Sequence, residues 1–114
     1  MALFAPVYNL LQSLRPRSIR PTTEDMLAVR EVRRLSAVYA GRENLALRDE
    51  FDSLRKRVQA GESPESPSIL RPAFGLVDEA MRRSLGFSLY DVQLLAGLAL
   101  TRGSIAEMQT GEGK

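Results

Sequence analysis

The sequence has 114 residues, 44% apolar and 26% charged, enough for one small folded domain or part of a larger one. It contains no cysteine and no histidine, which excludes disulfides, Cys/His metal sites, thiol nucleophiles and histidine acid–base catalysis. The net charge of +2 is too small to indicate nucleic-acid binding, and no apolar run approaches the roughly 20 residues that span a bilayer. We therefore expect a cytoplasmic protein.

The first twenty residues combine an apolar stripe with basic residues. The stripe repeats at helical spacing and ends at Pro16. Its members are Leu3, Phe4, Val7, Leu10, Leu11 and Leu14. Arg15, Arg17 and Arg20 follow, and residues 1–20 contain no acid. A basic amphipathic helix of this kind can lie on anionic lipid, and packing against its own domain is the alternative.

Two charged amphipathic helices are predicted in residues 21–60. Thr22 caps the first, with Asp25 at the third helical position in a variant of the capping box, and Gly41 interrupts it. Gly61 ends the second helix. The inward stripes are Ala28, Val32, Leu35 and Tyr39 in the first helix, and Leu47, Phe51, Leu54 and Val58 in the second.

A linker and a further helix follow. Residues 61–68 are rich in Gly, Ser and Pro and cannot anchor a core, so we predict a linker there. The next helix opens near Pro72, and Gly86 caps its end. Its predicted inward residues are Phe74, Val77, Ala80, Met81 and Leu85.

A last helix and a short strand are predicted at the C-terminal end. Ser88 caps the helix in an S-x-x-D arrangement with Asp91. Residues 92–100 are apolar nearly all round, so we expect this helix to be buried. Residues 104–108 are a strand candidate whose partners must come from outside this sequence. The predicted fold class is therefore mainly α, with four or five helices and one terminal strand.

Acidic residues accompany the arginines of the middle helices. These arginines include Arg33, Arg34, Arg55, Arg57, Arg82 and Arg83. An acid precedes a base by four residues in three pairs, Asp52–Lys56, Asp78–Arg82 and Glu79–Arg83. Such pairs are typical of solvated helix faces, which we favour over a nucleic-acid surface.

The sequence ends in Thr110-Gly111-Glu112-Gly113-Lys114, which is typical of the first half of a phosphate-binding loop. Such a loop surrounds phosphates with backbone N–H groups, neutralises them with lysine, and continues with a Ser/Thr hydroxyl that binds Mg²⁺. Met108 replaces the first glycine of G-x-x-x-x-G-K, so the segment follows the T-G-x-G-K form of helicase-like motors. We expect a nucleotide-driven motor interrupted inside this motif, and a solvated Gly-rich terminus is the alternative.

A second candidate site lies at Gln93 and the residues before it. A glutamine amide both donates and accepts, so it can read an adenine edge with two hydrogen bonds. Phe87 and Tyr90 are close enough in sequence to stack on the same base. The alternative is that Gln93 is an ordinary helix residue and the two rings are part of the core.

Residues 86–114 closely resemble the start of the motor domain of SecA, the preprotein translocase ATPase. The matching signatures are D-V-Q-L at 91–94 and I-A-E-M-x-T-G-E-G-K at 105–114, and residues 72–86 also resemble the helix before that motor. The resemblance implies that this mainly helical sequence supplies the start of an α/β P-loop, helicase-like motor domain.

The resemblance also implies roles for the matching residues. Gln93 would contact adenine, while Phe87 and Tyr90 would lie beside the base, where the family usually has methionine and phenylalanine. The start of the phosphate loop would be formed by Thr110, Gly111, Glu112, Gly113 and Lys114. The implied cofactor is ATP, with Mg²⁺ in the full-length family, although the residue that binds Mg²⁺ is absent from this sequence.

The implied function is that of a translocase subunit which couples ATP binding and hydrolysis to preprotein transport through a SecY-type channel. Its partners would be that channel, the anionic membrane surface and, through the missing region, preproteins. It would lie in the cytoplasm, peripherally associated with the inner face of the cell membrane. We expect the fragment alone to be inactive and able to self-associate.

The expected division is a basic helix and tail at 1–20, two charged helices at 21–60, a linker at 61–68 and the start of the motor at 69–114. Two other functions stay open. One is a non-enzymatic module that docks on a membrane or translocase. The other is a fragment of a nucleic-acid helicase, which explains the basic N-terminal segment less well.

Overall fold

The computed structural model describes residues 20–104 and 106. The helices in this part of the chain are α2 (Thr23–Ala40), α3 (Asn44–Gln59), α4 (Pro67–Leu85) and α5 (Asp91–Thr101). These described residues contain no strand, and none of their helices is long and apolar enough to cross a membrane. The mainly helical prediction is confirmed. The helix predicted at the N-terminus and most of the strand candidate at 104–108 lie outside the described residues.

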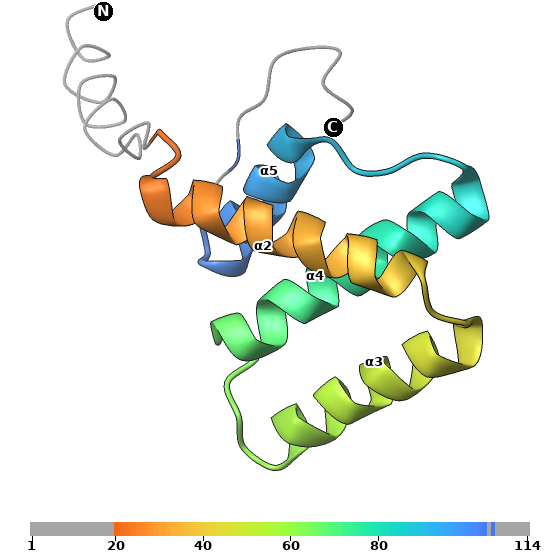
Figure 1. Cartoon of the computed structure of the whole chain (residues 1–114). Helices are drawn as coiled ribbons and strands as arrows, with labels where there is room; N and C mark the ends of the chain where they lie inside the picture. The colour runs from red at the N-terminus through yellow and green to blue at the C-terminus, as the bar shows by residue number, and fades with distance from the viewer. Residues whose placement is uncertain (1–19, 105, 107–114) are drawn as a thin grey trace, which may run out of the picture.

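Helix α2 lies across α4, and α3 and α5 flank this pair (Figure 1). The core joining α2 to α5 consists of Ala28, Val29, Val32, Leu94 and Leu98, with Leu70 and Phe74 of α4 packed against it. The core joining α2, α3 and α4 consists of Tyr39, Leu54, Ile69 and Leu76. Because α2 and α4 both contribute to the two clusters, this pair of helices is what α3 and α5 are positioned against.

Two helix ends follow the sequence prediction. At the start of α2, the Asp25 N–H donates to Thr22 Oγ1 over 3.2 Å, and the Thr22 N–H donates to Asp25 Oδ2 over 2.8 Å. This reciprocal pair is the predicted capping box. At the end of α4, Gly86 adopts the left-handed conformation with φ 80°, and its N–H donates to the Arg82 carbonyl. Both predictions are confirmed.

Two predicted helix starts are wrong. Helix α4 begins at Pro67 and not near Pro72, because Pro67 fits the first helical position and Pro72 is accommodated inside the helix. Helix α5 begins at Asp91, with Tyr90 as the N-cap residue, so Ser88 does not cap it. The reason is that residues 87–90 form no helix, and Leu89 among them is held by side chains of α2 and α4, as described below.

The predicted inward face of α4 is also largely wrong. Val77, Ala80 and Leu85 are exposed, and the buried positions of the helix include two acids. The buried residues are Ile69, Gly75, Leu76, Asp78 and Glu79. Phe51 of α3, predicted inward, is exposed, and α5 is buried along one face, with Leu100 exposed. Some apolar residues of α4 therefore lie on the surface, and the contact of α4 with α2 is partly polar.

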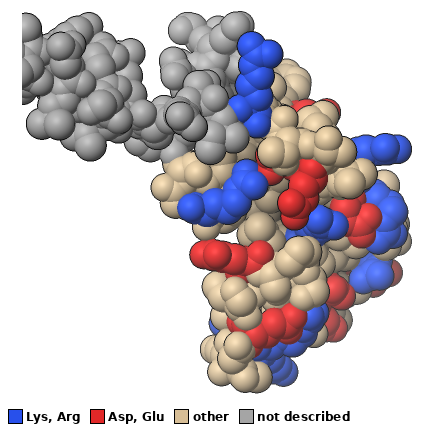
Figure 2. Space-filling view, turned by 90° about the vertical axis from the view of Figure 1, so that its left-hand side faces the viewer, with Lys and Arg blue, Asp and Glu red and all other residues tan. Residues whose placement is uncertain are grey.

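Six arginines of the middle helices form ion pairs with acids. The pairs are Arg33 with Asp78 and Asp91, Arg34 with Glu31, Arg55 with Asp52, Arg57 with Glu62, and Arg82 and Arg83 with Glu79. Charges of both signs are interspersed on the face shown in Figure 2. The predicted Glu79–Arg83 pair is confirmed, although Glu79 is buried. The predicted Asp78–Arg82 pair is wrong, since Asp78 faces α2 and bonds Arg33 instead.

Candidate functional site

Phe87, Tyr90 and Gln93, the residues predicted to contact the adenine base, lie where the chain passes from α4 to α5. We call this group the base side. Phe87 is 52% exposed and Tyr90 67% exposed, so the alternative that these rings belong to the core is wrong. Gln93 is half-buried in the first turn of α5. The structure thus brings the amide close to Tyr90. The other candidate residues, 110–114, lie outside the described residues.

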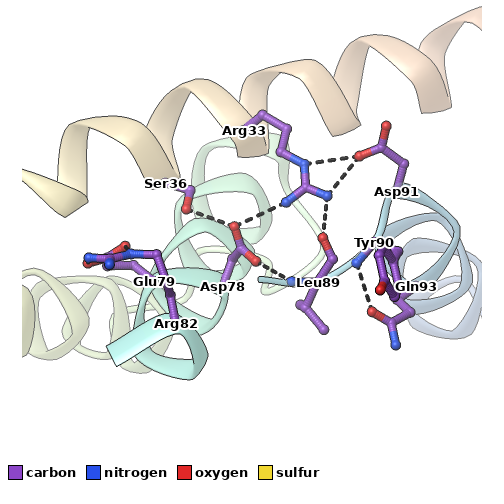
Figure 3. Close-up of polar contacts among 9 residues, drawn as sticks. All are labelled: Arg33, Ser36, Asp78, Glu79, Arg82, Leu89, Tyr90, Asp91 and Gln93. Atoms are coloured by element: carbon purple, nitrogen blue, oxygen red, sulfur yellow. Dashed lines mark hydrogen bonds and ion pairs between the residues drawn. The ribbon is translucent and has the colours of Figure 1, made fainter. Parts of the chain in front are cut away.

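The amide of Gln93 is oriented by the backbone of Tyr90. The Tyr90 N–H donates to Gln93 Oε1 over 2.7 Å (Figure 3). A glutamine at the third helical position that reaches back to the N-cap N–H is half of a capping box. An amide oxygen can accept two hydrogen bonds, so this contact orients the side chain and is compatible with a contact to a base edge.

A guanidinium from α2 reaches the same segment. Arg33 donates from Nη1 to Asp78 Oδ2 over 3.2 Å, and from Nε and Nη2 to Asp91 Oδ1 over 3.0 and 2.8 Å. Its Nη2 also donates to the carbonyl of Leu89. Figure 3 shows this guanidinium between the two carboxylates, with acceptors from α4, from α5 and from the segment between them.

Asp78 is the buried end of this network. Its side chain is 2% exposed, and it accepts from Ser36 Oγ over 2.8 Å and from the Leu89 N–H over 2.7 Å, in addition to Arg33. A buried carboxylate is stable only when its charge is paired and its oxygens accept hydrogen bonds. Both conditions are met for Asp78 inside the contact between α2 and α4.

The far end of α5 is also anchored on α2. Arg102 Nη1 lies 2.8 Å from Asp25 Oδ1. The pKa of Asp25 is lowered, first by the hydrogen bond from the Thr22 backbone N–H and further by Arg102. With Arg33 at one end and Asp25 at the other, α5 runs antiparallel to α2. The ion pair with Asp25 therefore fixes Arg102, the residue that follows α5, relative to α2.

The sequence prediction missed the network around Arg33, because Arg33 and Asp78 were assigned to solvated faces. One signal in the sequence points to it. Ser36 lies between Val32 and Tyr39 at helical spacing on the predicted inward stripe of α2. A polar residue inside an apolar stripe needs a partner on the facing element, and Asp78 is that partner.

The comparisons with family models and with curated proteins agree on one family. Residues 11–114 match the family model of the SecA DEAD-like domain. The chain is similar to protein translocase subunit SECA1, chloroplastic, of Arabidopsis thaliana, at 45% identity over 86 residues, which are 75% of this chain and 8% of the relative. It is also similar to protein translocase subunit SecA of Deinococcus radiodurans, at 56% identity over 73 residues, which are 63% of this chain and 8% of the relative.

A third relative, protein translocase subunit SecA of Deinococcus deserti, is 58% identical over 64 residues, which are 56% of this chain and 7% of that protein. The comparison with solved structures gave no match. The chain spans less than a tenth of the length of these relatives. The family match covers nearly the whole chain and agrees with these similarities. The chain therefore belongs to the SecA family of protein translocase subunits.

Proposed function

We propose that this chain supplies the base side of the nucleotide site in a SecA motor, with residues 87–93 facing adenine. The observation that carries the proposal is the hydrogen bond from the Tyr90 N–H to Gln93 Oε1, which holds an amide beside an exposed ring. An amide that donates and accepts matches the N6 and N7 edge of adenine, and exposed aromatic surface suits stacking. The residues present thus fit an adenine nucleotide.

The proposed nucleotide is ATP, bound with Mg²⁺, whose hydrolysis supplies the free energy for transport. In this proposal Gln93 selects the base, and Phe87 and Tyr90 cover its faces. Thr110 to Lys114 begin the loop that holds the phosphates, since successive backbone N–H groups and a lysine are suited to anions. The Mg²⁺ ligand would come from the residue after Lys114. The proposal includes an α/β architecture for the whole motor. It also includes the division of this chain into residues 1–20, 21–60, 61–68 and 69–114.

For the whole protein we propose ATP-driven transport of preproteins through a SecY-type channel at the inner face of the cell membrane. The support is the family together with the basic amphipathic pattern of residues 1–20, which suits an anionic surface. The pairing of Arg34, Arg55, Arg57 and Arg82 with acids favours this function over a nucleic-acid helicase, because these four guanidinium groups already have acidic partners.

The test of the base side is Gln93→Ala in a chimaera in which this chain replaces the matching segment of the Deinococcus radiodurans relative. We expect the variant to bind ATP more weakly by about 1–2 kcal/mol, since a hydrogen bond of the site is left unmade. Binding of GTP, which presents a different base edge, should change much less. Both affinities are measured by fluorescence of labelled nucleotides.

Gln59→Ala is the matched control, because Gln59 is an exposed glutamine at the end of α3. It should leave both affinities unchanged. An equal loss of ATP and GTP binding in Gln93→Ala would assign Gln93 a purely structural role and contradict the proposal.

A further inference from the structure

The segment before α5 depends on side chains for its conformation. Residues 87–90 belong to no helix or strand, yet both backbone groups of Leu89 are bonded. The Leu89 N–H donates to Asp78 Oδ1 over 2.7 Å, and its carbonyl accepts from Arg33 Nη2. The backbone of Leu89 is thus held by one side chain of α2 and one of α4, and not by hydrogen bonds of a helix or strand.

The same guanidinium fixes the start of α5. Arg33 bonds Asp91, the first residue of that helix. Tyr90 lies between the two residues that Arg33 contacts, and its N–H is the donor to Gln93 Oε1. The orientation of the Gln93 amide therefore depends on where Arg33 holds the backbone of residues 89–91.

Arginine is suited to this task because its guanidinium is planar and donates in fixed directions. Arg33 uses Nε, Nη1 and Nη2 on acceptors from α4, from α5 and from Leu89. A lysine carries one ammonium group and cannot reproduce this fork. Ser36 of α2 also donates to the buried Asp78, which adds a further contact between α2 and α4 to the network.

We propose that Arg33 is a positioning residue for adenine recognition, which sets the backbone of Leu89 to Asp91 so that Gln93 and Tyr90 face the base. The inference rests on the proposed function of residues 87–93. It assigns part of the nucleotide preference to a residue of α2 that lies far from the site in sequence and acts through Leu89 and Asp91.

The first test measures amide hydrogen exchange in the 114-residue chain. Arg33→Met removes the fork and keeps the length of the side chain. We expect exchange at Leu89 and Tyr90 to accelerate about tenfold or more, with little change at Leu76 in the core of α4. The matched control is Arg34→Met, the same substitution at the neighbouring position, where the side chain pairs locally with Glu31. It should leave these rates unchanged.

Asp91→Ala is the second variant, because it removes two of the Arg33 bonds and leaves Asp78 paired. The chain should fold, and exchange at Tyr90 should accelerate about threefold or more. Unchanged exchange at Leu89 and Tyr90 in both variants would overturn the inference, since the segment would then hold its shape without Arg33.

The second test measures nucleotide preference in the chimaera described above. Arg33→Met should lower the preference for ATP over GTP about fivefold or more. Arg33→Lys should restore thermal stability in part and leave that preference low, because the charge returns without the fork. A purely structural role would weaken ATP and GTP equally or be rescued by lysine, and either result would overturn the inference.

The two proposals fail in different ways. If Gln93→Ala does not change the nucleotide preference, the base side itself is misassigned, and the inference fails with it. If Gln93→Ala lowers the preference and Arg33→Met matches the Arg34→Met control, the base side stands and the positioning role of Arg33 is wrong.

Discussion

Replacing Glu79 with glutamine should lower the free energy of unfolding at pH 7 by about 3 kcal/mol. The Glu79 side chain is 1% exposed and bonds two arginines of its own helix. Arg82 donates from Nε and Nη2 over 2.8 and 2.6 Å, and Arg83 donates from Nε over 2.6 Å. These contacts, those of Arg82 first, lower the pKa of Glu79 to about 2. A neutral amide would leave both guanidinium groups without their counter-charge.

The acid dependence of stability gives a second measurement of the same interaction. The pKa of Glu79 falls from its ordinary value of 4.5 to about 2 on folding, so the unfolded chain binds more protons between these values. The stabilisation is complete above pH 4.5 and is lost as the pH falls toward 2. Urea unfolding across this range should show a steep loss of stability in the native chain and a shallower one in Glu79→Gln.

Glu31→Gln is the control, because Glu31 forms a single exposed pair with Arg34 three residues away on α2. Exposed pairs contribute little, so the free energy of unfolding should hardly change. A Glu79→Gln variant as stable as this control, with an unchanged acid profile, would mean that the buried pair contributes nothing.

The Glu79 cluster also joins helices that are distant in sequence. Arg83, held by Glu79, donates from Nη2 to the carbonyls of Tyr39 and Arg42 over 3.0 and 2.5 Å, and from Nη1 to Asn44 Oδ1 over 2.5 Å. These acceptors end α2, form the connection and begin α3. The loss of Glu79 should therefore loosen the connection between α2 and α3 as well as α4.

Features that depend on a few neighbouring residues could be predicted from the sequence. Thr22 and Asp25 form their capping box within one turn, and Gly86 ends α4 because it tolerates a positive φ. The base-side role of Phe87, Tyr90 and Gln93 also comes from local sequence, around the D-V-Q-L signature at 91–94, and it stays a prediction. None of these predictions required knowledge of the facing helix.

The inward face of α4 could not be predicted in the same way. Asp78 and Glu79 each precede an arginine by four residues, and that spacing also occurs on solvated helices. What buries Asp78 is Arg33, which is 45 residues away in sequence, together with Ser36. Helical periodicity contains no information about such a partner, so the apolar residues Val77 and Leu85 were assigned inward in its place.

Replacing Gly75 with leucine should lower the free energy of unfolding by at least about 3 kcal/mol, because α2 and α4 cross at this residue. A Cβ atom at Gly75 would lie 3.1 Å from Leu35 Cβ, 3.2 Å from Tyr39 Cε2 and 3.3 Å from the Ser36 nitrogen. The remaining atoms of leucine have no space there unless the helices separate. Glycine weakens a helix by about 1 kcal/mol relative to alanine, so its presence in α4 is explained by this close approach.

Ala80→Leu is the matched control, since Ala80 is an exposed position of the same helix. Its free energy of unfolding should stay within about 0.5 kcal/mol of the native value. Equal stability of the two leucine variants would mean that α2 and α4 are farther apart than described.

The same substitution also tests how the crossing supports the base side. The bond from Ser36 to Asp78 spans 2.8 Å beside Gly75, and Asp78 in turn holds the Leu89 N–H. Separation of the two helices by even one ångström would exceed hydrogen-bond distance for Ser36. Amide exchange at Leu89 should therefore accelerate in Gly75→Leu and stay unchanged in Ala80→Leu. The close crossing would then be what allows a residue of α2 to act on the segment that contains Gln93.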